Sequence, residues 1–214
     1  MGCRRFGVEN AMRKIPGLLL LLCCVCGALG QQKWAVPNLE ELDQADALSR
    51  GRAHLSVDEE ALIKKVTRKG IDACLKYPGP GDPTTTSAAF GQFQVRRVEL
   101  TPGGDTGLVM QSTGSCTCGA TGNCAFWLIA GGQNPRVVLA VAFGIQTFGF
   151  DKAQTAGYYE LVLGQHASAT VTDLKRYRFD GTRYRLHDCA LLSWGDKDGN
   201  MLQKPRITRT RCQR

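Results

Sequence analysis

The spacing of apolar positions changes once along the chain, from a helical period to an alternating one. Ser56 is followed three residues later by Glu59, which is the capping-box pattern of a helix start. The apolar residues that then fall at helical spacing are Leu62, Ile63, Val66, Cys74 and Leu75. Prolines at 78, 80 and 83 end the pattern. We therefore predict a helix within residues 55–78, followed by a linker over residues 79–92.

Beyond the linker, short apolar runs separated by turn residues favour strands. Asp180-Gly181 is the strongest of the turn signals, because this dipeptide tolerates the positive φ angles that a tight two-residue hairpin requires. The predicted strands cover residues 93–100, 108–110, 125–129, 137–143, 158–163, 177–179 and 183–186. The fold class is thus mainly β: an antiparallel meander or partial propeller-like sheet over residues 93–214, with one N-terminal helix and disulfide bonds.

Residues 1–30 have the layout of an export signal. Four basic residues flank or precede an uncharged apolar run over 15–29, and Ala28-Leu29-Gly30 offers a cleavage site before Gln31. The run is too short for a permanent membrane helix, and no later stretch is long and apolar enough to span. A start at Met12 gives a tighter version of the same signal. We expect a secreted or periplasmic protein, with a lipid anchor at Cys26 as the weaker alternative, and a flexible leader over residues 31–54.

The net charge of the chain and the distribution of its basic residues say little about its binding partners. After removal of residues 1–30, 23 basic and 18 acidic residues remain, a net charge of +5. The basic residues are scattered, with small clusters at Lys64-Lys65, at Arg68-Lys69 and in the tail from residue 206. A solvated surface is the favoured interpretation, and an envelope protein or an anionic cell-wall polymer is the alternative partner. Nothing in the pattern indicates specific nucleic-acid binding.

Six cysteines follow the expected signal, and an even number in an exported chain favours disulfides. Spacing suggests Cys118 with Cys124 and Cys189 with Cys212, which leaves Cys74 for Cys116. A metal site built from Cys116, Cys118 and Cys124 is the alternative, although its spacing is not that of a familiar zinc site.

Several stretches of the chain resemble a known group of proteins. They are Val98–Val109, Cys118–Trp127, Thr155–Leu161 and Tyr177–Tyr184. Over about residues 88–190 the chain resembles uncharacterised secreted bacterial proteins with degenerate FG-GAP or VCBS-like propeller-type repeats. The segments 95–112 and 144–166 share one such pattern of strand, turn and strand. Intact repeats of this type hold calcium in an aspartate-rich loop, but the matching loop of this chain keeps only Asp105. The resemblance implies no catalytic activity.

No nucleophile, metalloprotease or phosphate-loop motif occurs in the sequence, so no catalytic residue, metal ligand or cofactor is predicted. His54, His166 and His187 lack a motif, and pairing His187 with Cys189 as a nucleophile would require a free thiol. Asp196–Asn200 begins like a calcium loop but lacks the later glutamate, so a polar turn is favoured. The strand aromatics are predicted to pack in the core rather than to line a ligand groove.

These observations favour an exported, non-enzymatic binding or structural module of the envelope or extracellular space, whose ligand the sequence does not identify. The alternative is a hydrolase that acts on the cell wall, or an inhibitor of one. Its groove would have to gather His166, Asp173 or Glu160.

Overall fold

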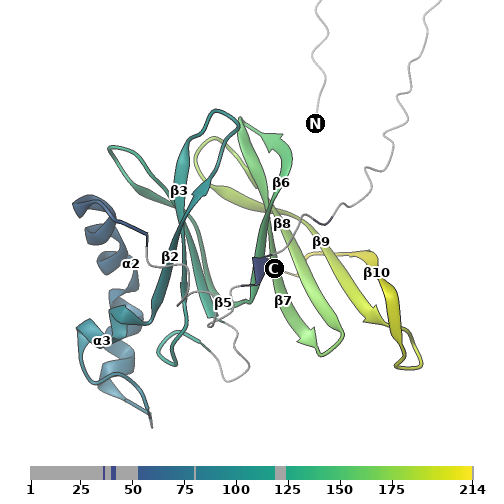
Figure 1. Cartoon of the computed structure of the whole chain (residues 1–214), viewed down its shortest axis with the longest axis horizontal. Coiled ribbons are helices and arrows are strands. Elements are labelled where there is room, and N and C mark those ends of the chain that lie inside the picture. The colour runs from purple at the N-terminus through teal and green to yellow at the C-terminus, as the bar shows by residue number, and fades with distance from the viewer. Residues whose placement is uncertain (1–35, 37–39, 42–52, 80, 119–123, 214) are drawn as a thin grey trace, which may run out of the picture. The chain divides into compact units, whose positions relative to one another are not determined.

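Two antiparallel sheets and two helices make up the described part of the chain (Figure 1). The structure is a computed structural model that describes residues 36, 40–41, 53–79, 81–118 and 124–213. All of them belong to one structural unit, residues 34–214. The expected export signal, with both candidate starts and Cys26, lies outside the described residues, and so does most of the expected leader.

The predicted N-terminal helix is present as α2 (Val57–Lys76). Both halves of the capping box form, because Ser56 Oγ accepts from the Glu59 amide at 3.2 Å and Glu59 Oε2 accepts from the Ser56 amide at 2.9 Å. The helix buries one stripe, with Ile63, Thr67 and Ile71 on successive turns. Thr67 is tolerated there because its hydroxyl donates to the Ile63 carbonyl at 2.8 Å.

The predicted linker contains a second helix that the sequence analysis missed. This short helix, α3 (Thr86–Gly91), begins at Thr85, whose side-chain oxygen accepts from the Ala88 amide at 3.2 Å. A run of threonine and serine suggests a loop, but one of these hydroxyls caps a helix instead. Residues 79–92 are therefore partly helical.

The four-stranded sheet consists of β2 (Phe93–Glu99), β3 (Thr106–Ser112), β4 (Cys124–Ala130) and β5 (Arg136–Ile145), paired in that order. Side chains of α2 and α3 pack on one of its faces, and the six-stranded sheet packs on the other. Burial on both faces explains why β3 and β4 are buried almost throughout, and why β4 and the Leu108–Met110 run of β3 are continuously apolar rather than alternating.

The six-stranded sheet has the order β1-β6-β7-β8-β9-β10. Its strands are β1 (Glu40–Glu41), β6 (Thr147–Thr155), β7 (Tyr158–Ser168), β8 (Val171–Phe179), β9 (Tyr184–Gly195) and β10 (Met201–Thr210). Strand β10 was not predicted, and β6 was anticipated only as the first strand of the strand-turn-strand pattern over residues 144–166. The sequence analysis also expected the leader to tether rather than pack, whereas β1 pairs with β6, and Val36 packs on the outer face of this sheet.

The four-stranded sheet is a meander, and so are strands β6–β10 of the other sheet, to which β1 is added at the edge. The prediction of a mainly β, antiparallel fold with an N-terminal helix is therefore confirmed. The segments 95–112 and 144–166 fall in different sheets, on β2–β3 and on β6–β7. The main core lies between the sheets. Its aromatic members include Phe126, Phe148, Tyr177 and Tyr184, which confirms the core interpretation of these four residues.

Candidate binding groove between the helices

A groove of about 530 Å³ lies between α2 and α3. It combines an apolar floor with a basic rim. The residues that line it are Ala61, Lys64, Lys65, Arg68, Ile71, Asp72, Thr86 and Phe90. We call it the α2–α3 groove.

The amphipathic pattern of α2 produces the rim. Ile71 belongs to the stripe that packs towards the sheet and is fully buried. Lys64, Lys65 and Arg68 lie beside that stripe at spacings of one, three and four residues, so all three border the same hollow. From the other side, α3 places the half-buried Phe90 against the groove.

The charges of the rim are only partly neutralised. Lys64 Nζ lies 2.6 Å from a carboxylate oxygen of Glu60, and Arg68 Nε lies 3.6 Å from one of Asp72. Both pairs are exposed, so each contributes little and exchanges readily with solvent or ligand. Lys65 makes no ion pair with any side chain among the described residues. The groove therefore presents a net positive charge.

Two devices fix the connection between the helices. Asp82 accepts from the Gly79 amide at 2.6 Å and from the Ser115 hydroxyl. These hydrogen bonds, that of Ser115 first, lower the pKa of the Asp82 carboxyl. Next to Ser115, Cys116 forms a disulfide with Cys74 in the last turn of α2. The walls are thus held in place, which reduces the entropy that a ligand must overcome.

The lining offers positive charge beside apolar surface, and it contains neither cysteine nor histidine. A basic rim above an apolar floor fits an anionic chain that also carries an apolar side chain.

The six cysteines form the three pairs that their spacing suggested: Cys74–Cys116, Cys118–Cys124 and Cys189–Cys212. The thiolates of the alternative metal site at Cys116, Cys118 and Cys124 are therefore all consumed. No group of three or more His, Cys, Asp or Glu side chains within the described residues is placed to hold a metal ion.

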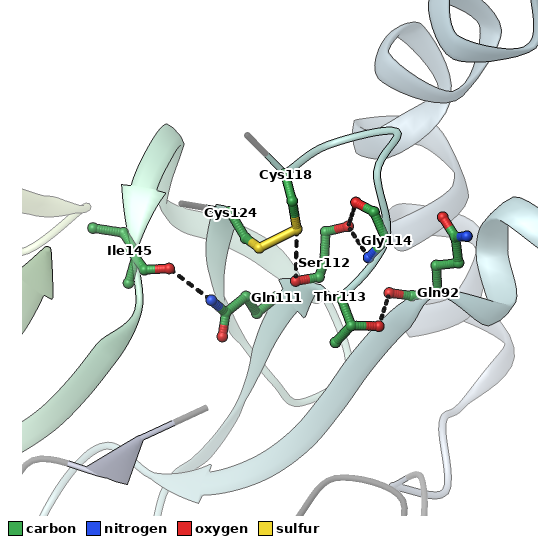
Figure 2. Close-up of a disulfide and its surroundings, with 8 residues drawn as sticks. All are labelled: Gln92, Gln111, Ser112, Thr113, Gly114, Cys118, Cys124 and Ile145. Atoms are coloured by element: carbon green, nitrogen blue, oxygen red, sulfur yellow. Dashed lines mark hydrogen bonds between the residues drawn. A yellow bond between two sulfur atoms is a disulfide. The ribbon is translucent and has the colours of Figure 1, made fainter. Parts of the chain in front are cut away.

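Figure 2 shows how the Cys118–Cys124 disulfide packs beside β3. Cys118 Sγ lies 3.4 Å from the Ser112 carbonyl oxygen, a contact in which an oxidised sulfur has no proton to donate. The neighbouring Gln111 is buried and donates from Nε2 to the Ile145 carbonyl at 2.7 Å. This hydrogen bond links β3 to the end of β5, so Gln111 holds two strands together beside the disulfide.

The residues expected of a hydrolase groove do not gather. His166 is exposed near the end of β7, and Glu160 lies six residues earlier on that strand, about 20 Å away at ~3.3 Å per residue. Asp173 is paired in register with Gln165, so it projects from the face opposite to that of His166. Glu160 is itself buried in ion pairs with Arg176 and Arg178.

His187 borders a second hollow, of about 720 Å³, next to the Cys189–Cys212 disulfide. Asp188 and Arg211 line it too. The expected obstacle to a cysteine nucleophile is present, because Cys189 has no free thiol. His54, the third histidine, is exposed just before α2.

The two loops considered for calcium are hydrogen-bonded turns. Asp196 Oδ1 accepts from the amides of Asp198 and Asn200, each at 2.9 Å, and Oδ2 accepts from the Asn200 side chain at 3.1 Å. These hydrogen bonds lower the pKa of Asp196. In the other loop, the Asp105 amide donates to Thr101 Oγ1 at 3.1 Å. Both geometries are those of polar turns.

The sequence analysis noted the basic cluster of α2 but interpreted it as solvated surface. Its relation to Phe90 could not be anticipated, because α3 itself was not predicted. Neither helix of the described chain has the length and apolar content of a membrane span. No family model, curated protein or solved structure matches the chain.

Proposed function

We propose that this chain is an exported, disulfide-stabilised binding module that holds an acidic segment of another exported protein in its α2–α3 groove. The observation that carries the proposal is the meeting of Lys64, Lys65 and Arg68 above a floor that includes Ile71 and Phe90. The export layout of residues 1–30 and the three disulfides support an oxidising compartment.

A protein segment fits the groove better than a cell-wall polymer does. A sugar-phosphate chain would satisfy the three cations but would leave the apolar floor in contact with polar groups. An acidic peptide with one large apolar side chain satisfies both parts, since its carboxylates meet the rim while its apolar group covers Phe90.

The binding test uses a fluorescein-labelled peptide, Glu-Asp-Leu-Phe-Asp-Glu, titrated with the oxidised mature chain and followed by anisotropy. The double variant Lys64→Glu/Lys65→Glu should weaken binding about tenfold, because two favourable charge contacts become repulsive. Lys152→Glu/Arg183→Glu, which changes the net charge equally at two exposed positions that do not line the groove, is the matched control and should stay within about twofold.

The same titration includes a version of the peptide with Leu and Phe replaced by Ser, and a poly(glycerol phosphate) chain. If either binds as tightly as the parent peptide, the apolar floor has no part in recognition and the proposal fails in favour of a polymer-binding site. Equal effects of the two charge-reversed variants would show attraction to net charge alone, which also contradicts the proposal.

Export is tested separately. The full chain, expressed in a bacterial host with an intact secretion system, should be recovered outside the cytoplasm with Gln31 at its N-terminus and no free thiols. Recovery from the cytosol with the N-terminus intact would contradict export without bearing on the groove.

A further inference from the structure

Strand β10 is a long edge without a described neighbour on its outer side. It pairs with β9 on one side and ends the six-stranded sheet, and no other strand among the described residues pairs with it. In an edge strand, alternate residues direct their N–H and C=O groups away from the sheet. Figure 1 shows β10 at the opposite end of the view from α2 and α3, so this edge is separate from the groove.

The β9–β10 hairpin also concentrates exposed apolar side chains. Of the six large apolar side chains that are exposed among the described residues, four lie on these two strands: Leu186, Trp194, Met201 and Ile207. Met201 is 67% exposed and Trp194 is 40% exposed. Isolated surface apolar residues are ordinary, so only the neighbouring Trp194 and Met201, where β9 meets β10 at the turn, add apolar surface to this edge as a pair.

The positive charge of the β10 edge favours an acidic partner. From Met201 to Gln213 the chain contains Lys204, Arg206, Arg209 and Arg211 and no acidic residue. Two copies of β10 placed side by side would bring these cations together, so pairing between copies is disfavoured. A strand that carries acidic side chains would instead be attracted.

Both ends of β10 are held in place before any partner strand binds. The turn that leads into it is closed by the hydrogen bonds of Asp196 with Asp198 and Asn200. Two residues past its end, Cys212 is tied to Cys189 of β9. The register of β10 with β9 shifts between Met201 and Arg206, so the regular edge is Arg206–Thr210. This part, held by the disulfide next to its end, loses little entropy when another strand is added.

We infer that the outer edge of β10 binds an extended acidic segment of another protein by strand addition. Backbone hydrogen bonds would supply affinity, and the basic side chains would supply selectivity. The inference rests on the edge alone and does not require the groove to bind anything.

The probe is a capped peptide, Thr-Glu-Val-Glu-Val-Glu-Thr, titrated with the oxidised mature chain. Binding should slow hydrogen exchange of backbone amides within Met201–Thr210. Methylation of three consecutive central amides of the peptide blocks strand pairing but keeps every charge, and should weaken binding at least about tenfold. Lys204→Glu/Arg206→Glu should also weaken it about tenfold, whereas Lys152→Glu/Arg183→Glu, at two exposed positions outside both the groove and β10, should stay within about twofold.

Three outcomes would overturn the inference. One is an absence of binding up to about 1 mM peptide. Another is equal binding of the methylated peptide, or of a version with Lys in place of Glu, because neither supports an acid-selective strand pairing. The last is self-association of the chain that sedimentation velocity detects and that Lys204→Glu/Arg206→Glu alters, since the edge would then join copies of the chain. Because hydrogen exchange is followed within Met201–Thr210, failure at β10 is distinguishable from failure at the groove.

Discussion

Arg97 of β2 and Glu59 of α2 form a bidentate ion pair in which both N–O distances are 3.1 Å. The guanidinium also donates to the His54 carbonyl at 2.9 Å. Glu59 is simultaneously the capping-box glutamate of α2, so one carboxylate both caps the helix and anchors it to the sheet. Since Glu59 is buried and Arg97 is partly exposed, the pair sits where solvent screens it only in part.

Replacing this carboxylate should destabilise the fold. We expect Glu59→Gln to lower the free energy of unfolding by about 2 kcal/mol at neutral pH, from a weakened cap and a lost charge-assisted hydrogen bond. Urea unfolding measures the difference. The control is Glu60→Gln, which makes the same substitution at the exposed neighbouring glutamate and should change the free energy of unfolding by less than about 0.5 kcal/mol. Comparable losses in the two variants would contradict the anchoring role.

The same pair predicts a dependence on pH. The hydrogen bond from Arg97, followed by those within the capping box, lowers the pKa of Glu59 below its ordinary 4.5 despite burial. The unfolded chain therefore takes up this proton first as pH falls, and the stabilisation is present above about 4.5 and is lost as pH drops through the folded pKa. The stability difference between wild type and Glu59→Gln should shrink as the pH falls below about 4.5. A difference that stays constant over this range would show that the charge is not responsible.

The elements that the sequence predicted are those with a local signal. The capping box determines the start of α2 through two hydrogen bonds within four residues. A turn forms at Asp180-Gly181, but it is a four-residue connection between the paired Phe179 and Tyr184 and not the two-residue hairpin that was predicted. Gly181 adopts a φ of 96°, and Asp180 accepts from the Thr182 and Arg183 amides. Such contacts depend on neighbours in sequence, so single-sequence analysis can find them.

The missed elements depend on distant partners. Strand β10 contains Pro205 and several charged residues, a composition that argues against a strand, yet it forms because β9 offers a paired edge and Cys189 holds its end. The α2–α3 groove is missed for the same reason. Lys65 and Phe90 are 25 positions apart, and only the packing of α3 against α2 brings them to one surface.

The disulfides should differ in their effect on stability. Cys74–Cys116 closes a separation of 42 residues, and Cys118–Cys124 closes one of 6. Loop-closure entropy then predicts losses of about 4 and about 2 kcal/mol when each pair is replaced by serine. Urea unfolding of the two double variants tests the order. A larger loss for the Cys118–Cys124 variant would mean that strain or residual structure outweighs loop entropy.

Four charged residues on the outer face of the six-stranded sheet form a network around Arg176. This guanidinium contacts Asp151 at 3.2 Å and Glu160 at 3.3 Å, and Arg178 contacts Glu160 at 2.5 Å. Arg176 and Glu160 are both buried. Strands β6, β7 and β8 each contribute at least one of these residues, so the network also links three neighbouring strands.

Removing two oppositely charged members of this network together should cost less than the sum of the losses in the single variants, Glu160→Leu and Arg176→Met. We expect Glu160→Gln to lower the free energy of unfolding by about 3 kcal/mol, because it leaves buried guanidinium groups without their shared carboxylate. In Glu160→Leu/Arg176→Met the buried opposite charges leave together, so the loss should be smaller than the sum of the two single losses. A double-mutant cycle followed by urea unfolding measures the coupling. Strict additivity would show that the pair is screened by solvent.

Gly107 lies where the backbone of β3 passes closest to its neighbours. A Cβ at this position would come within 2.5 Å of the Ile129 carbonyl oxygen and 2.6 Å of Leu100 Cδ1. The oxygen belongs to the backbone of the adjacent strand β4, so it cannot turn away as a side chain would. Gly107→Ala must therefore displace a strand of the four-stranded sheet.

We expect Gly107→Ala to lower the free energy of unfolding by about 2–3 kcal/mol, the usual range for overpacking at a buried site. Gly103→Ala in the preceding turn is the matched control, because its new Cβ would meet only Thr101 Oγ1, at 3.7 Å. That variant should stay within about 0.5 kcal/mol of wild type. If both variants unfold at the same urea concentration as wild type, the sheet relaxes around the added methyl group, and the close approach of β3 and β4 does not require glycine.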